Sequence, residues 1–307
     1  MSRAKPATVT ESNLPTGGAP SKALLEIDLP TFRGNFNRHP FPVRHRLSDH
    51  PLFKLPELVE LSRRLPENLV EYYPGDVPVS IDSRLIPRTG LSIQETIRRI
   101  EECRSWMVLK CAHQDPIYSE LLDRCLEEIQ PHSEPLAPGM CQRAAAVFIA
   151  SPGAVTPYHM DHEINFLLQI RGSKSISIFD HADRSVVAEE EFERYFTGDR
   201  IHRNMEFKDE WQRKASVFRL TPGAGVHVPA TDPHWVKNDD NVSISFAIYF
   251  LTAECDRVDA VHQANARLRK LGLDPSPVGH SFWRDAAKYH GLRVFRRAQQ
   301  LISHKTV

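Results

Sequence analysis

The sequence is poor in cysteine, and its cysteines form no recognisable motif. There are five, and no two of them make a C-x-x-C pair: Cys103, Cys111, Cys125, Cys141 and Cys255. An odd number also leaves one over in any framework of disulfides. This pattern favours buried thiols in a reducing compartment over a disulfide-stabilised secreted domain.

Membrane-spanning segments and an excess of charge are missing as well. The chain has no apolar run of about 18 residues, and residues 1–22 lack the apolar centre of a signal peptide. Lys plus Arg and Asp plus Glu each number 39, so the formal net charge is zero and no overall basic field indicates nucleic acid. We therefore expect a cytoplasmic protein without a membrane span or a nucleic-acid partner.

The first half of the chain predicts an N-terminal tail followed by helices. Residues 1–22 are rich in proline, glycine, serine and threonine, which is typical of a disordered tail. Residues 23–140 predict a segment of helices and wrapping loops. The helix signals in it are leucines at helical spacing from Leu55 to Leu65, a capping box at Ser92 and Glu95, and a helix start at Asp115 and Pro116. Between the first two signals, the proline-rich stretch 72–90 predicts a long loop.

From about residue 141 the pattern becomes that of strands. Short β-branched or aromatic runs are separated by Gly, Pro, Asp or Asn: AAAVFIAS, NFLLQI, KSISIF, ASVFRL, GVHVP and VSISFAIYF. Such runs are typical of an antiparallel sandwich or barrel. Helical spacing returns after Glu254. The sequence therefore predicts a mainly β protein with flanking helices (α+β), with a barrel over residues 141–252 and C-terminal helices over 253–307.

Polar residues interrupt one strand-like stretch, TPYHMDHEINF at residues 156–166. Residues two apart on a strand face the same way, so His159 and Asp161 point together while His162 points away. An imidazole beside a carboxylate supplies two ligands of the two-His, one-carboxylate triad that leaves open positions on Fe(II). The same H-x-D pattern occurs on polar surface strands. The surrounding residues are therefore needed to distinguish a metal site from a surface strand.

Two separated motifs resemble those of the cupins. The first, G-x5-H-x-H-x3,4-E-x6-G, is matched in position by Gly153, His159, Asp161, Asn165 and Gly172. The second, G-x5-P-x-G-x2-H-x3-N, is matched in position by Gly223, Pro229, Thr231, His234 and Asn238. Three residues depart from the motifs: Asp161 replaces a histidine, Asn165 a glutamate and Thr231 a turn glycine. The resemblance covers about residues 143–252 and implies a double-stranded β-helix, or jelly roll.

The substitutions are similar to those of the JmjC-type branch of this superfamily, in particular its asparaginyl-hydroxylase-like members. The run T-P-x-H-x-D followed by N-F-x-x-Q-I-x-G-x-K carries this likeness. It implies that the Fe(II) ligands and catalytic residues are His159, Asp161 and His234. It also implies that 2-oxoglutarate is bound through its distal carboxylate by Lys174, with help from Thr156 and Asn165.

The residues themselves offer modest independent support for Lys174. It shares a strand face with Ile176 and Ile178, so on an internal face its ammonium would need an anion. The simpler alternative is an exposed lysine just after a turn at Gly172.

Other polar residues near the motifs have structural interpretations. His227 competes with His234 for the place of third ligand, and the spacing of the second motif favours His234. Asp232, which precedes a proline, is typical of a turn. Tyr158 and Trp235 flank the expected ligands and are expected to pack.

The resemblance implies a 2-oxoglutarate-dependent dioxygenase that consumes O2 and hydroxylates a peptide or protein side chain or an amino-acid-like small molecule. Hydroxylation and demethylation are not distinguished by the sequence. Two alternatives remain: a cupin dioxygenase that does not use 2-oxoglutarate and so would not need Lys174, and a JmjC-like regulatory or binding module without turnover. The C-terminal helices suggest a homodimer, as in the family that the chain resembles.

Overall fold

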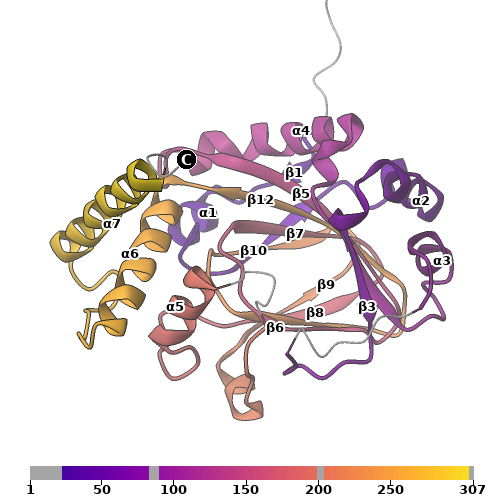
Figure 1. The fold of residues 1–307 in the computed structure, drawn as a ribbon. Helices are drawn as coiled ribbons and strands as arrows, with labels where there is room; N and C mark the ends of the chain where they lie inside the picture. Colours follow the sequence, from indigo (N-terminus) through magenta and orange to yellow (C-terminus); the bar gives the residue numbers. More distant parts are fainter. Residues whose placement is uncertain (1–22, 83–89, 199–203, 304–307) are drawn as a thin grey trace, which may run out of the picture.

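The computed structural model describes residues 23–82, 90–198 and 204–303, so the predicted disordered tail lies outside the described residues (Figure 1). Two antiparallel sheets form the centre of the fold. The larger sheet has the strand order β1-β2-β10-β7-β12-β5-β4-β3, and the smaller sheet the order β6-β11-β8-β9. The strands are β1 Leu25–Glu26, β2 Phe41–His45, β3 Val70–Pro74, β4 Ser105–Leu109, β5 Cys141–Ala150, β6 Val155–His159, β7 Ile164–Arg171, β8 Lys174–Ile178, β9 Ser216–Leu220, β10 Ala224–Val228, β11 His234–Asn238 and β12 Ser243–Leu251.

The two sheets face each other and share an inner core. Leu167 and Ala247 of the larger sheet pack in one buried cluster with Ile176 and Val236 of the smaller sheet. The alternation of the strand residues explains this arrangement, because every second side chain turns inward. The face that Lys174 shares with Ile176 is therefore internal, as the sequence analysis had considered.

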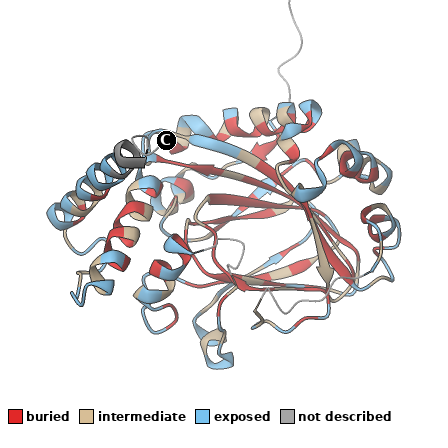
Figure 2. Cartoon of the chain, in the orientation of Figure 1, coloured by how far each residue is buried: buried red, intermediate tan, exposed pale blue. Residues whose placement is uncertain are grey.

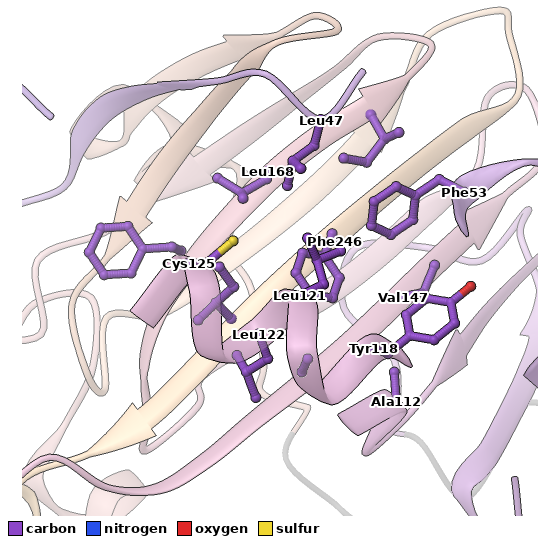
Figure 3. Packing of buried hydrophobic residues seen from close by; sticks show 14 of the residues in the cluster. Leu47, Phe53, Ala112, Tyr118, Leu121, Leu122, Cys125, Val147, Leu168 and Phe246 are labelled. Carbon is purple, nitrogen blue, oxygen red and sulfur yellow. The ribbon is translucent and has the colours of Figure 1, made fainter. Parts of the chain in front are cut away.

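Helices cover the outside of this barrel (Figure 1). They are α1 Leu29–Asn35, α2 Leu55–Arg64, α3 Ile93–Arg98, α4 Pro116–Ser133, α5 Glu189–Thr197, α6 Ala253–Lys270 and α7 Phe282–Ser303. Figure 3 shows α4 lying on the outer face of the larger sheet, with Leu121 and Cys125 beside Phe246. In the described part of the chain, no helix is both long and apolar enough to cross a membrane.

The predicted helix starts are present. The side chain of Ser92 accepts a hydrogen bond from the Glu95 amide and the Glu95 carboxylate accepts one from the Ser92 amide, which is the capping box at the start of α3. The Asp115 carboxylate caps α4 by accepting a hydrogen bond from the Ile117 amide.

Residues 23–140 also contribute strands that the sequence analysis did not predict. Strands β1–β4 all join the larger sheet, and residues 72–74 of the proline-rich stretch complete β3 rather than belonging to a loop. Residues 83–89 of that stretch lie outside the described residues. β4, with the sequence SWMVL, is buried at every position, so it lacks the alternation by which a strand is recognised.

The C-terminal helices lie beside one end of the barrel. α6 packs against α5 on one side and α7 on the other. Figure 2 shows the contrast between the buried residues of α6 and the largely exposed surface of α7.

Candidate metal centre and the adjoining cavity

The three predicted ligands come together at one end of the smaller sheet. His159 is the last residue of β6 and His234 the first of β11, and the two are paired directly in the ladder. Asp161 follows β6 by two residues. Its Oδ2 lies 3.8 Å from Nε2 of His159 and 3.8 Å from Nε2 of His234. All three residues are buried.

Backbone carbonyls orient both imidazoles. Nδ1 of His159 lies 2.7 Å from the carbonyl oxygen of Pro157, and Nδ1 of His234 lies 2.9 Å from that of Asp232. A carbonyl oxygen only accepts, so each Nδ1 carries the proton and donates it. In the neutral ring the lone pair is then on Nε2, which is the nitrogen that faces Asp161. Such a second hydrogen bond is the usual way in which a metal-binding histidine is held.

The donor set and its spacing fit one metal ion. Two atoms that are each about 2.1 Å from a shared ion lie within about 4.2 Å of one another, and the 3.8 Å separations meet this limit. Two imidazoles and one carboxylate are the donor set of Fe(II) oxygenase sites, in which further positions stay open. The three residues could therefore hold Fe(II).

A left-handed turn precedes His234. Thr231 has φ 67°, at the position where the second cupin motif has glycine. Its amide donates a 2.7 Å hydrogen bond to the carbonyl oxygen of Asp161, which ties this turn to the segment that carries the third ligand. A β-branched residue is strained in this conformation. The backbone of the motif is thus kept although its glycine is not.

A cavity extends from the three ligands into the barrel. Its empty space, including its opening, is ≈ 550 Å³, and both sheets line it. Thr156 and Lys174 enter from the smaller sheet, and Asn165 enters from β7 of the larger one. The ladder places Lys174 opposite Asn238, four residues along β11 from His234. At about 3.3 Å per residue, the backbone of Lys174 stands about 13 Å along the sheet from that of His234.

Lys174 is a buried cation without a counter-charge. Lys174 is 5% exposed, and in the described part of the chain its ammonium takes part in no hydrogen bond or ion pair. Burial lowers the pKa of Lys174 from 10.5 to about 7. A carboxylate bound beside it would compensate this cost. The exposed-lysine alternative is therefore wrong.

Two further polar atoms in the cavity have no hydrogen-bond partner among the described residues. Oδ1 of Asn165, a predicted cosubstrate residue, is buried and unpartnered. So is Nε1 of Trp106, which the sequence analysis missed. Together with Lys174, these atoms offer one acceptor and two donors. The two donors, Lys174 and Trp106, fit the oxygens of a dicarboxylate, which only accept hydrogen bonds, whereas Oδ1 of Asn165 needs a donor.

Two other histidines near the site are not ligands. His227 is fully buried, its ring packs between Phe36, Phe41 and Phe166, and its Nε2 accepts a hydrogen bond from the Asn37 amide. It lies outside the cavity that His234 lines. His162 lies in the loop after β6 rather than on a strand, so the expected alternation does not set its direction; its Nδ1 is 3.3 Å from the hydroxyl of Tyr195, and it lines a different cavity from the metal residues.

Asp232 does more than begin a turn. It is 2% exposed, and its Oδ1 accepts hydrogen bonds from Nδ1 of His181 at 2.6 Å and from the His181 amide at 3.1 Å. Burial raises the pKa of Asp232, and the hydrogen bonds from His181 oppose that rise. Because the carbonyl of Asp232 also orients His234, this pair fixes one wall of the metal centre.

The two aromatic residues beside the ligands pack, as expected. Tyr158 is fully buried against Phe179 and Phe207. The indole Nε1 of Trp235 donates to Oε1 of Gln212, away from the cavity.

The sequence matches no protein-family model and no curated protein. Among solved structures, the ribosomal oxygenase YcfD from Escherichia coli, in complex with cobalt and 2-oxoglutarate, is similar with a TM-score of 0.50 and 14% identity over 89% of this chain and 67% of that chain. Another crystal structure of Escherichia coli YcfD aligns with a TM-score of 0.48 and 12% identity over 88% and 66%. The DMSP lyase DddQ from Ruegeria pomeroyi DSS-3 covers 36% of this chain and 40% of its own, with a TM-score of 0.24 and 16% identity. The double-stranded β-helix predicted from the two motifs is confirmed, and this chain shares the fold of an oxygenase.

Proposed function

We propose that this protein is an Fe(II)- and 2-oxoglutarate-dependent dioxygenase that acts as a hydroxylase. The observation that carries the proposal is the placement of His159, Asp161 and His234 at one end of a cavity whose other end holds the unpaired ammonium of Lys174. With both groups bound, oxidative decarboxylation of 2-oxoglutarate by O2 supplies an oxidant that inserts oxygen into a C–H bond.

The chain's own residues would bind and orient these groups. His159, Asp161 and His234 would ligate Fe(II) through Nε2, a carboxylate oxygen and Nε2, and would leave further positions accessible. Lys174 would pair with the distal carboxylate of 2-oxoglutarate. Thr156 and the Asn165 side chain would hold the cosubstrate along the cavity wall. The apolar inner core behind them excludes water from the reacting centre.

The substrate that we favour is a side chain of a peptide or protein, because the similar Escherichia coli structure is that of a ribosomal oxygenase. The alternative substrate is an amino-acid-like small molecule, which would be hydroxylated by the same reaction. O2 is the second substrate in either case.

The test is an anaerobic titration of the apoprotein with Fe(II) and 2-oxoglutarate, in the wild type and in Lys174→Ala. We expect the weak visible charge-transfer band of the chelated cosubstrate in the wild type and a weaker band, at the same cosubstrate concentration, in the variant. Iron binding without the band in the wild type would favour a cupin dioxygenase that does not use 2-oxoglutarate. A protein that binds no iron would favour the regulatory module.

We also propose a homodimer formed through the C-terminal helices. Large apolar side chains are exposed on α7 and on the segment before it: Leu271, Leu273, Phe282, Trp283, Val294 and Phe295. Trp283 is 80% exposed and contacts Phe282 in an edge arrangement. A second copy of this helix would bury such side chains.

A further inference from the structure

A second cavity lies between helices α5–α7 and the two loops next to the metal ligands, the loop after β6 and the loop before β11. Its empty space, including its opening, is ≈ 950 Å³. It shares no lining residue with the cosubstrate cavity, and the chain between Asp161 and His162 separates the two: Asp161 lines the cosubstrate cavity and His162 lines the second one. The second cavity is therefore a distinct site.

Within residues 23–82, 90–198 and 204–303, two buried polar atoms in its wall have no hydrogen-bond partner. One is Nδ1 of His262 on α6, a residue that is 4% exposed. The other is Oδ1 of Asp285 on α7, a residue that is 5% exposed. Both residues line the cavity. Buried polar groups are nearly always satisfied in folded proteins, so two such atoms in one wall need an explanation.

Neighbouring groups show which partner these atoms need. Oε2 of Glu189, also unpartnered, lies 3.9 Å from Nδ1 of His262. Carboxylate oxygens only accept hydrogen bonds. Burial lowers the pKa of His262 to about 3, so its ring is neutral and one ring nitrogen can accept. Both atoms in the wall, Nδ1 of His262 and Oδ1 of Asp285, can therefore be satisfied by a ligand that donates.

The charges in the wall favour a donor that is positively charged. The guanidinium of Arg184 is already paired with Glu189, and that of Arg257 with Glu254. Oδ2 of Asp285 accepts a hydrogen bond from the Gly279 amide, while Oδ1 lies 3.9 Å from the ammonium of Lys288, which donates to Ser276. A cation would form a charge-assisted hydrogen bond with Asp285.

One part of the wall is apolar. The ring of His262 is stacked between Phe192 and Phe196, with centroids 5.1 Å and 5.2 Å away. Val258 and Val261 continue this surface along α6. A small apolar stem would pack on it while a charged end reaches Asp285.

We propose that this cavity is a binding site for an ammonium or guanidinium group on a short apolar stem, held by Asp285 and His262. A free amine and a lysine or arginine side chain of a peptide share this chemistry. Binding needs neither metal nor cosubstrate, so the site can be tested apart from the oxygenase proposal.

The test is calorimetric titration of the full-length protein with butylammonium, at constant ionic strength, beside the neutral butanol and the anionic butyrate. We expect saturable binding of butylammonium at least about tenfold tighter than that of butanol, and no binding of butyrate. This comparison uses only the wild type, so it does not depend on whether a variant folds. Equal affinity for butanol, binding of butyrate, or no saturable binding of butylammonium would overturn the proposal.

Variants then locate the site. Asp285→Asn keeps the shape of the side chain and should weaken butylammonium binding at least about tenfold. Asp274→Asn is the matched control, because the Asp274 side chain is 96% exposed, and it should leave binding unchanged. Unweakened binding in a folded Asp285→Asn variant would overturn the assignment. Titration with an N-acetylated, C-amidated Gly-Lys-Gly peptide distinguishes the sources: tighter binding than butylammonium indicates a peptide side chain, and weaker binding a free amine.

Discussion

The imidazole rings of His159 and His234 lie 4.3 Å apart, centroid to centroid, because β6 and β11 pair these two residues directly. The rings are thus positioned by a backbone ladder rather than by loops. Asp161 reaches the pair from the segment after β6, and a hydrogen bond from the Thr231 amide to its carbonyl holds that segment. A site built on rigid elements in this way is organised before any metal binds.

Replacing Asp161 with asparagine should remove most of the metal affinity. The variant keeps the shape of the side chain but loses the charge that two neutral imidazoles do not supply. We expect Fe(II) affinity, measured anaerobically by calorimetry, to fall more than about 100-fold, since even residues that only support a ligand change affinity about 10–100-fold. Asp274→Asn is the control, because the Asp274 side chain is 96% exposed and belongs to neither group of possible metal ligands in the described part of the chain. Similar affinities in the two variants would contradict the assignment of Asp161.

Replacing Lys174 with methionine should stabilise the protein without cosubstrate. The change removes a buried ammonium that has no partner and keeps a chain of similar length. We expect the free energy of unfolding, measured in urea at pH 7, to rise by about 1–4 kcal/mol. We also expect 2-oxoglutarate affinity to fall. Lys237→Met is the control, because Lys237 is exposed on the neighbouring strand β11. A loss of stability in Lys174→Met would count against an unpaired buried charge.

The stability gained by Lys174→Met should depend on pH. Burial lowers the pKa of Lys174 from 10.5 to about 7. Between pH 7 and 10.5 the unfolded chain keeps a proton on this lysine that the folded protein releases, so the free energy of unfolding of the wild type rises with pH in this window. Below pH 7 both states carry the proton and the full cost of the buried charge remains. The difference between variant and wild type should therefore shrink by about 2 kcal/mol from pH 7 to pH 9. A constant difference in urea unfolding would show that Lys174 does not titrate in this range.

The proposed dimer predicts the effect of a charge on α7. Trp283→Glu places a carboxylate at a side chain that is 80% exposed in the single chain. If a second copy buries this surface, the variant should run as a monomer in size-exclusion chromatography with light scattering, while the wild type runs as a dimer. Ile117→Glu is the control, because Ile117 is an exposed apolar residue on α4. A monomeric wild type would show that the dimer prediction is wrong.

The metal residues could be found from the sequence because their signal is local. His159 and Asp161 are two apart in the sequence, and His234 stands at a fixed place in a second short motif. Trp106 carries no such signal. It belongs to a strand that is buried throughout, and its position at the cavity follows from its pairing with Ala150 in β5. Only the register between two separate strands places the indole inside the barrel.

Long-range packing also explains why the second cavity was not predicted. His262 and Asp285 lie on separate helices with ordinary helical spacing around them, and the residues near them in sequence give no reason to single them out. Their role depends on how α6 and α7 meet α5 and the turn at Thr231. Thr231 itself was recognised as a departure from the motif, yet its left-handed backbone could be seen only in the structure.

Trp106→Phe should weaken cosubstrate binding without loss of fold or metal. Phenylalanine keeps an aromatic ring against Tyr73 but removes the Nε1 donor, which has no partner in the part of the chain that the structure describes. The free energy of unfolding should therefore change little, whereas losing a hydrogen bond to a charged ligand group should weaken 2-oxoglutarate binding about tenfold or more. Trp235→Phe is the matched control, and its expected effects on stability and on cosubstrate affinity are the reverse of those of Trp106→Phe. Its Nε1 donates to Gln212 outside the cavity, so it should lose stability and keep cosubstrate affinity. Unchanged 2-oxoglutarate affinity in Trp106→Phe, measured by calorimetry with the metal bound, would mean that the indole N–H does not face the cosubstrate.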